Sequence, residues 1–330
     1  MKQLLNRLIN HENISSEEAK QVLVNISNGE YNQSQIASFL TVFMMRSITL
    51  EELTGFRDAL LELCIPIDLS DFNAIDLCGT GGDGKDTFNI STLSSFVTAG
   101  AGIKVSKHGN YGVSSACGSS NVMEHLGIKF SNNPDFLKKC IDKTNICVLH
   151  APLFHPAMKN VAPIRRELGV KTFFNMLGPM VNPSFPQNQM VGVFNLELQR
   201  LYSYLYQQSN KNYSIVHALD GYDEISLTGK TKIISNNSET ILSPENLDVK
   251  KVEQKAIFGG SSVKSAAKIF TNIISGKGTI EQNNVVFANA GLAIATSKQI
   301  SHKEGFELAK ESLLSGKAEE SLTDLIELSK

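Results

Sequence analysis

A glycine-rich turn between a predicted strand and a predicted helix constrains the fold of this chain more than any other segment. The apolar run from Ala74 to Cys78 predicts a buried strand, and four glycines follow between positions 79 and 84. The sequence Asn-Ile-Ser-Thr from Asn89 then opens a helical pattern. Glycines let backbone N–H groups approach phosphate oxygens, and a helix N-terminus adds partial positive charge. The segment therefore predicts a substrate that carries phosphate.

Two nucleotide-binding motifs match this turn only in part. The dinucleotide motif requires an acidic residue about 20 positions further on, and no Asp or Glu lies between Asp86 and Glu124. The P-loop motif requires Ser or Thr after its lysine, whereas Asp86 follows Lys85. We therefore reject both motifs, and a glycine-rich turn without a ligand stays open as the alternative.

The composition is that of an ordinary globular protein. The 330 residues are 42% hydrophobic and carry a formal net charge of −2, which argues against binding nucleic acid through bulk charge. The five cysteines form no Cys-x-x-Cys pair, so we expect reduced thiols, a cytoplasmic protein and no zinc site. No uninterrupted apolar run approaches 18 residues, so we expect no membrane segment.

The chain changes its pattern near residue 70. The first 65 or so residues predict helices only, with capping boxes at Ser15 and Thr49. From Ala74 onwards strands alternate with helices, which is typical of a mostly parallel sheet flanked by helices. We therefore predict an α/β fold with a small all-helical domain over residues 1–68 and a large α/β domain over residues 69–330.

The positions of the elements follow from the apolar periodicity. The predicted strands are 74–78, 103–106, 146–149, 190–194, 214–218 and 232–234. The predicted helices of this part are 91–101, 121–126, 134–142, 157–168, 196–208, 263–275, 280–297 and 302–314. Asn121 is predicted to cap the helix that Gly127 ends.

A second loop rich in small and hydroxyl-bearing residues follows the strand 103–106. It runs from Lys107 to Asn121. Because the carboxyl ends of parallel strands meet at one edge of a sheet, this loop and the glycine-rich turn are expected to hold two ends of one anionic ligand. A solvated polar turn is the alternative.

An acidic turn follows the strand 214–218. It contains Asp220, Asp223 and Glu224 around Gly221. Magnesium is commonly bound by one or two carboxylates and completes its shell with water and substrate phosphates. The turn therefore predicts a magnesium site, with an exposed acidic turn as the alternative.

Two arginines lie next to the apolar stripe of the predicted helix 157–168. Arg165 and Arg166 could simply favour the helix dipole at its C-terminal end. Either could instead bind a carboxylate in bidentate fashion. The pattern leaves both interpretations open.

Taken in order, these motifs resemble those of the anthranilate phosphoribosyltransferase family. The matching segments are 79–83, 89–92, 107–110, 118–119, 165–169, 174–179, 182–183 and 220–226, with a weaker match at 287–291. The resemblance implies that residues near 160–185 join the helical domain and that the protein is a homodimer. It also implies transfer of the ribose 5-phosphate unit of phosphoribosyl pyrophosphate to the amine of anthranilate, with release of pyrophosphate, in tryptophan biosynthesis.

The resemblance assigns residues to each ligand and requires no covalent nucleophile. The implied phosphoribosyl pyrophosphate contacts are Gly79, Gly82, Asp83, Thr87, Asn89, Ile90, Ser91, Thr92, Lys107 and Ser119. The implied anthranilate contacts are Gly79, His108, Asn110 and Arg165. The implied ligands of two magnesium ions are Ser91, Asp223 and Glu224.

Four residues of the second loop depart from the family pattern. Tyr111 stands where arginine is expected, Ala116-Cys117 replaces a Lys-Ser pair, and Asn121 replaces an aspartate. The loss of two cations is expected to weaken binding of phosphoribosyl pyrophosphate, whereas the change at Asn121 is expected to be mild.

Two other functions fit parts of the same pattern. A pyrimidine-nucleoside phosphorylase shares this architecture, but it has no clear role for Arg165 or for the pair Asp223 and Glu224. A non-catalytic paralogue that binds nucleic acid should be basic, in contrast to the net charge of −2.

Overall fold

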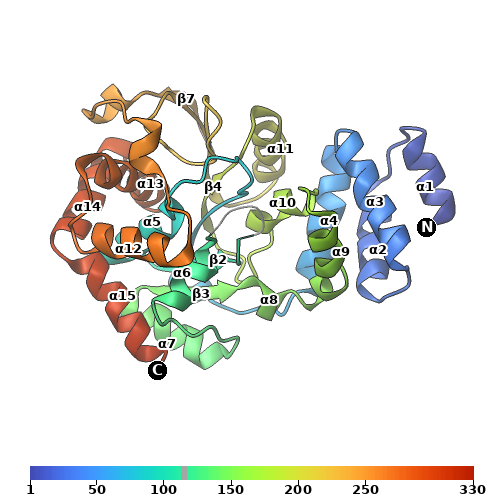
Figure 1. The fold of residues 1–330 in the computed structure, drawn as a ribbon, viewed down its shortest axis with the longest axis horizontal. Coiled ribbons are helices and arrows are strands. Elements are labelled where there is room, and N and C mark those ends of the chain that lie inside the picture. The colour runs from blue at the N-terminus through green and yellow to red at the C-terminus, as the bar shows by residue number, and fades with distance from the viewer. Residues whose placement is uncertain (113–116) are drawn as a thin grey trace. The chain divides into compact units, whose positions relative to one another are not determined.

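The structure is a computed structural model that describes residues 1–112 and 117–330 (Figure 1). Two compact units make up the chain. The helical unit consists of residues 1–66 and 151–183, so a mid-chain segment belongs to it. The α/β unit consists of residues 67–150 and 184–330.

The helical unit begins with four helices and is completed by the mid-chain segment. The helices are α1 (Lys2–Ile9), α2 (Ser16–Ser27), α3 (Gln33–Met45), α4 (Leu50–Leu63), α8 (Ala151–Phe154), α9 (Ala162–Leu168) and α10 (Phe174–Leu177), with 3₁₀ turns at Pro156–Asn160 and Gly178–Met180. The capping boxes predicted at Ser15 and Thr49 are confirmed. The prediction of one helix over 157–168 was wrong, because the 3₁₀ turn ends at Asn160 and a separate helix starts with Pro163 in its first turn.

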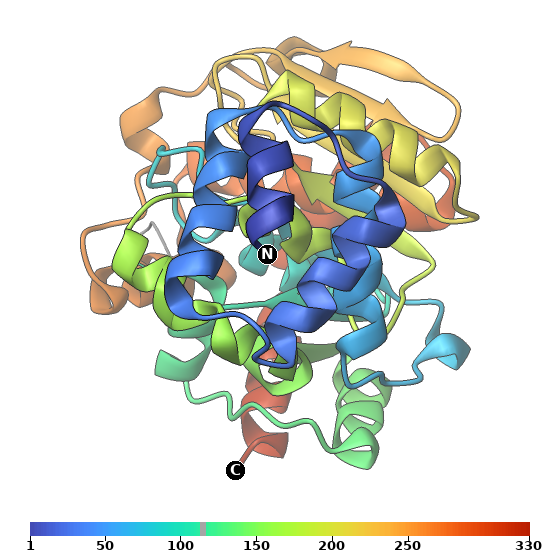
Figure 2. The ribbon, with the colours of Figure 1, turned by 90° about the vertical axis from the view of Figure 1, so that its right-hand side faces the viewer.

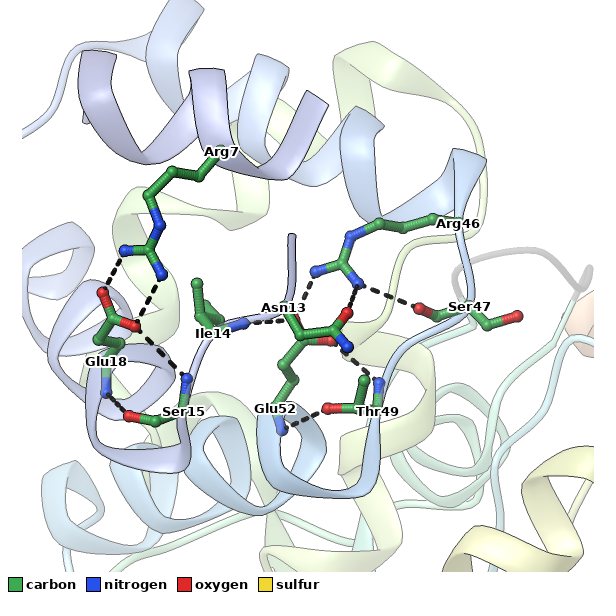
Figure 3. A network of polar contacts seen from close by, with 9 residues as sticks. All are labelled: Arg7, Asn13, Ile14, Ser15, Glu18, Arg46, Ser47, Thr49 and Glu52. Carbon is green, nitrogen blue, oxygen red and sulfur yellow. Dashed lines mark hydrogen bonds and ion pairs between the residues drawn. The ribbon is translucent and has the colours of Figure 1, made fainter. Parts of the chain in front are cut away.

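Aromatic rings and one buried ion pair hold the helical unit together. Phe56 stacks on Phe173 of the mid-chain segment, with ring centroids 4.4 Å apart. The buried carboxylate of Glu52 accepts hydrogen bonds from the backbone N–H of Ile14 and from Arg46 (Figure 3). This carboxylate therefore ties the loop before α2 to the loop between α3 and α4.

The described part of the α/β unit contains one seven-stranded sheet with strand order β3-β2-β1-β4-β5-β6-β7. The strands are β1 (Ile75–Gly79), β2 (Val105–Gly109), β3 (Ile146–His150), β4 (Asn188–Gly192), β5 (Asn212–Ala218), β6 (Thr231–Ser235) and β7 (Glu239–Leu242). The first five are parallel, while β6 and β7 extend the sheet in antiparallel fashion. Figure 2 shows the helix α11 (Leu196–Gln207) next to this antiparallel edge.

Further helices pack around the sheet and complete the unit. They are α5 (Ile90–Gly100), α6 (Ser119–His125), α7 (Pro134–Thr144), α12 (Val263–Ile274), α13 (Ile280–Lys298), α14 (His302–Leu314) and α15 (Lys317–Leu328). The predicted α/β fold with a mostly parallel sheet and a helical domain is confirmed. The sequence pattern missed β7 and α15, and it placed β4 two residues too late because that strand starts with the buried polar residues Asn188 and Gln189.

No helix in the described ranges has the length and hydropathy needed to cross a membrane.

Candidate functional site

The sheet topology creates a ligand-binding position at the carboxyl end of β1. The strand β1 pairs with β2 on one side and with β4 on the other. The chain continues from β1 to β2 on one side of this position and from β4 to β5 on the other. Open α/β sheets bind ligands in the crevice that forms where the strand order reverses in this way. The glycine-rich turn, the second loop and the acidic turn follow β1, β2 and β5 in that order.

Asp223 connects the acidic turn to the glycine-rich turn. Its Oδ2 accepts a hydrogen bond of 2.7 Å from the backbone N–H of Gly81, and its side chain is 7% exposed. A Cβ atom at Gly79 would collide with Oδ2 of Asp223, and one at Gly192 would collide with its carbonyl oxygen. Glycine at position 192 therefore lets the backbone of the acidic turn approach, whereas a side chain at position 79 would displace the carboxylate of Asp223. The role of Gly192 had no motif to reveal it in the sequence.

Glu224 connects the acidic turn to the start of α5. Its carboxylate accepts hydrogen bonds from Oγ1 of Thr87 at 3.2 Å and from the backbone N–H of Ser91 at 3.3 Å. A carboxylate at a helix N-terminus is stabilised by the exposed N–H groups and by the helix dipole.

Asn89 connects the glycine-rich turn to the second loop. Its Nδ2 donates a hydrogen bond of 3.2 Å to the carbonyl of Cys117. Within the second loop, Oγ of Ser119 and the backbone N–H of Ser120 donate to the carbonyl of Asn110 at 3.2 and 3.1 Å. The structure therefore brings together the three loops that lie far apart in the sequence.

The helix cap predicted at Asn121 was wrong. The helix α6 begins at Ser119 and Gly118 occupies the N-cap position. Oδ1 of Asn121 instead accepts hydrogen bonds from the backbone N–H groups of Gly112 and Gly118, at 2.9 and 3.0 Å. These bonds close the second loop, and an aspartate could accept both of them equally well.

The other departures from the family pattern lie in the same loop. The ring of Tyr111 packs edge-on against His150 with centroids 4.8 Å apart, and its hydroxyl donates to Glu124. The tyrosine therefore fastens the loop to β3 and α6 without supplying a cation. Of the predicted Ala116-Cys117 departure, Ala116 lies outside the described residues.

The strand β2 places two predicted ligand contacts inside the sheet. Lys107 is 1% exposed, and its ammonium donates a 2.8 Å hydrogen bond to the carbonyl of Leu77. Burial lowers the pKa of Lys107, while the charge of Asp76 acts in the opposite direction. Asp76, which the sequence pattern did not single out, also accepts from the backbone N–H of His108 at 3.1 Å.

The remaining predicted phosphate contacts line the glycine-rich turn and the first turn of α5. Ile90 and Thr92 are buried, and the hydroxyl of Thr92 has no hydrogen-bond partner among the described residues. Gly82 and Ser91 are half-buried. Oδ1 of Asp83 accepts from the backbone N–H of Lys85 at 3.1 Å, whereas its Oδ2 is buried with no hydrogen-bond partner in the described part of the chain.

The carboxylates of the site repel one another. Burial, followed by the charge of Asp83, raises the pKa of Asp223 to about 7. Burial, followed by the charge of Asp223, raises the pKa of Glu224 well above its usual value. A cation would relieve this repulsion and would also give a partner to the unpaired oxygen of Asp83.

The donor set fits magnesium better than a metal enclosed by protein ligands. Among the described residues no three His, Cys, Asp or Glu side chains converge on a common metal position. Magnesium typically takes one or two carboxylates and fills its shell with water and phosphate oxygens. Asp223 and Glu224, which contact the glycine-rich turn and the start of α5, match the carboxylate part of that pattern.

The predicted anthranilate contact Arg165 belongs to α9 of the helical unit. Its Nη2 donates to Oδ1 of Asn175 at 3.2 Å, and its guanidinium lies 5.3 Å from the ring centre of Phe174. Burial lowers its pKa to about 10, and its Nε has no hydrogen-bond partner within the described residues. A half-buried guanidinium with an unused donor can bind a carboxylate.

Comparison with known proteins matches both parts of the chain to glycosyltransferases. The a/b domain of a glycosyl transferase family matches residues 71–319, and the helical bundle domain of a glycosyl transferase family matches residues 2–64. An anthranilate phosphoribosyltransferase of Flavobacterium psychrophilum is 72% identical over 329 residues, which cover 100% of both chains.

Solved structures of anthranilate phosphoribosyltransferases also resemble this chain over nearly its whole length. The anthranilate phosphoribosyltransferase of Thermus thermophilus superposes with a TM-score of 0.90 at 31% identity, covering 98% of each chain. The Saccharomyces cerevisiae enzyme in complex with PRPP (phosphoribosyl pyrophosphate) and Mg superposes with a TM-score of 0.89 at 28% identity, covering 98% of this chain and 96% of that one. The chain therefore belongs to the anthranilate phosphoribosyltransferase family, glycosyltransferases that transfer the 5-phosphoribosyl group of phosphoribosyl pyrophosphate to the amine of anthranilate in tryptophan biosynthesis.

Proposed function

We propose that the carboxyl edge of the parallel sheet is where this chain binds phosphoribosyl pyrophosphate and transfers its phosphoribosyl group to anthranilate. The observation that carries this proposal is the set of hydrogen bonds that joins the three loops. Asp223 bonds to Gly81, Glu224 bonds to Ser91, and Asn89 bonds to Cys117. These loops place backbone N–H groups, a helix N-terminus and carboxylates within one site, as a diphosphate with its cations requires.

In this proposal the glycine-rich turn and the start of α5 bind the phosphates. The contacts are Gly79, Gly82, Asp83, Thr87, Asn89, Ile90, Ser91 and Thr92, with Ser119 from the second loop. The buried hydroxyl of Thr92, which has no hydrogen-bond partner among the described residues, supports its place in this set. Lys107 contributes positive charge from within the sheet, since its ammonium bonds to Leu77.

Asp223, Glu224 and Ser91 are the proposed ligands of two magnesium ions. When bound with the substrate, magnesium neutralises the departing pyrophosphate. The raised pKa values of both carboxyl groups support the assignment, because they indicate that the site favours added positive charge.

Anthranilate is the proposed second substrate, with Arg165 pairing with its carboxylate. Gly79, His108 and Asn110 are the further proposed contacts. The buried Nε donor of Arg165, which has no partner among the described residues, supports this role.

The reaction needs no nucleophilic side chain from the protein. The amine nitrogen of anthranilate forms a bond to C1 of the ribose, the C1–O bond to pyrophosphate breaks, and the amine loses a proton. The products are N-(5-phosphoribosyl)anthranilate and pyrophosphate. The residues of the site hold the two substrates in line and compensate the charge of the leaving group.

We further propose a homodimer in the cytoplasm. Large apolar side chains are exposed on the contacting helices α1 and α3 of the helical unit: Ile9 is 61% exposed and Met45 is 80% exposed. Such side chains favour an interface between copies. The five free cysteines fit a reducing compartment. Light scattering of the purified chain tests the dimer.

Loss of anthranilate fluorescence on addition of phosphoribosyl pyrophosphate and magnesium tests the activity. The double variant Asp223→Asn, Glu224→Gln should abolish this loss while the protein stays folded by circular dichroism. The exposed Asp71→Asn is the control and should keep full activity. Absence of fluorescence loss in the unmodified chain, or phosphorolysis of thymidine or uridine in its place, would contradict the proposal.

A further inference from the structure

The buried side chain of Asn289 on α13 bonds to the backbone directly after the two carboxylates. Asn289 is 2% exposed. Its Oδ1 accepts a hydrogen bond of 3.0 Å from the N–H of Ile225, and its Nδ2 donates one of 2.8 Å to the carbonyl of the same residue. A further 2.8 Å bond runs from Nδ2 to the carbonyl of Val285 one turn earlier in α13. The amide therefore uses both of its N–H groups, and its orientation is defined.

The backbone of Ile225 needs a hydrogen-bond partner because it is buried and belongs to no strand or helix. It is fully buried and lies in the irregular segment after β5, outside the strands of the sheet. Buried backbone N–H and C=O groups are almost always hydrogen-bonded. The side-chain amide of Asn289 pairs with both groups of Ile225, as the peptide group of a neighbouring strand would.

A cavity next to Asn289 links the segment that contains Ile225 to the carboxylates of Asp223 and Glu224. A small cavity of about 10 Å³ is lined by Ser94, Asp223, Glu224 and Asn289, among others. If the amide were removed, the space that it leaves would add to this cavity and would let the segment settle towards the helix. The helix α13 also packs against α5, whose first turn contains Ser91.

We propose that Asn289 is a positioning residue for magnesium, because it holds the backbone of Ile225 and thereby the carboxylates of Asp223 and Glu224 in place. The inference rests on the proposed function, since that function makes the two carboxylates metal ligands. It also gives a physical role to the segment 287–291, which was the weakest of the sequence motifs. Partners that orient metal ligands typically change metal affinity by about 10–100-fold when removed.

Calorimetric binding of phosphoribosyl pyrophosphate at fixed magnesium, without anthranilate, tests this role independently of turnover. Asn289→Ala removes all three hydrogen bonds, whereas Asn289→Asp keeps the size of the side chain and loses the donors. The control is Thr296→Val on the same helix, which removes a buried hydrogen bond to Ser214 near the opposite end of β5. Urea unfolding of each variant records the loss of stability.

We expect both Asn289 variants to require roughly 10-fold more magnesium for the same substrate affinity. Thr296→Val should bind as the unmodified chain does, even where it loses as much stability. Unchanged magnesium dependence in the Asn289 variants, or an equal loss in Thr296→Val, would overturn the inference. Should Asn289→Ala not fold, Asn289→Asp alone carries the test. An unmodified chain that fails to bind phosphoribosyl pyrophosphate with magnesium would overturn the proposed function itself, and this inference with it.

Discussion

Replacing Asp223 by asparagine should stabilise the magnesium-free protein at neutral pH while it abolishes transfer. Burial and the charge of Asp83 raise the pKa of Asp223 from 3.8 to about 7 on folding. In this range the folded protein binds more protons than the unfolded chain does. The contribution of this carboxyl group to stability is therefore complete below pH 3.8 and is lost as the pH rises through 7.

The size of the stability gain follows from the pKa shift of Asp223. One pKa unit corresponds to about 1.4 kcal/mol, so a shift of about three units sets an upper limit of about 4 kcal/mol. Glu224 shares the repulsion, so we expect a gain of about 2–4 kcal/mol for Asp223→Asn at pH 8. The asparagine keeps an oxygen for the N–H of Gly81 and offers a donor to Asp83, so the packing need not change. For domains of 150–250 residues, each kcal/mol raises Tm by about 2–4 °C.

Urea unfolding between pH 5 and pH 8, without magnesium or substrate, measures this effect. The difference in free energy of unfolding between Asp223→Asn and the unmodified chain should be about a third of its full size at pH 5, because that pH lies only about one unit above the unfolded pKa of 3.8, and it should be nearly complete at pH 8. The exposed Asp71→Asn should show no such growth. A variant that is less stable than the unmodified chain at pH 8, or a constant difference across this range, would refute the reasoning.

Three further substitutions test the geometry of the site. Gly192→Ala places a Cβ against the carbonyl of Asp223 and should cost about 1–3 kcal/mol of stability together with most of the activity; normal kinetics would contradict the close approach. Arg165→Ala should raise the anthranilate KM at least about ten-fold, since a hydrogen bond to a charged group contributes about 1.5–3 kcal/mol, whereas the exposed Arg166→Ala should not; equal KM values would remove Arg165 from the site. Asn121→Asp should keep the KM for phosphoribosyl pyrophosphate and Asn121→Ala should raise it, because only the aspartate can accept the two backbone N–H bonds that close the second loop; steady-state kinetics of both variants decide this.

The sequence predicted the loops of the site well because they follow buried parallel strands. A strand covered on both faces is an uninterrupted apolar run, and the polar residues after it mark its carboxyl end. For β1 and β5 this located the glycine-rich turn and the acidic turn to within a residue or two. The topology then required both to lie at one edge, without any knowledge of side-chain contacts.

Side-chain directions and contacts between distant elements were not predictable in this way. The sequence pattern ended the strand at Ser106 and placed Lys107 in the second loop, whereas Lys107 lies on β2 and its ammonium donates to the carbonyl of Leu77. Asn121 has the residue type of a helix cap, yet its oxygen closes the loop before it. Asn289 lies within the apolar stretch 285–295 of α13, and only the position of Ile225 in space explains it. Each of these roles depends on a partner that periodicity does not identify.

The features that make the site costly to fold are those that allow it to bind its proposed ligands. Two glycines at strand ends and the amide of Asn289 hold the acidic turn so close that Asp223 and Glu224 cannot both ionise without strong repulsion. The backbone N–H groups of Gly81 and Ser91 offset this repulsion only in part, since the pKa values stay raised. A diphosphate alone would add more negative charge, and a cation alone would find few protein oxygens to complete its shell. The geometry therefore favours joint binding of magnesium and phosphoribosyl pyrophosphate over binding of either one by itself.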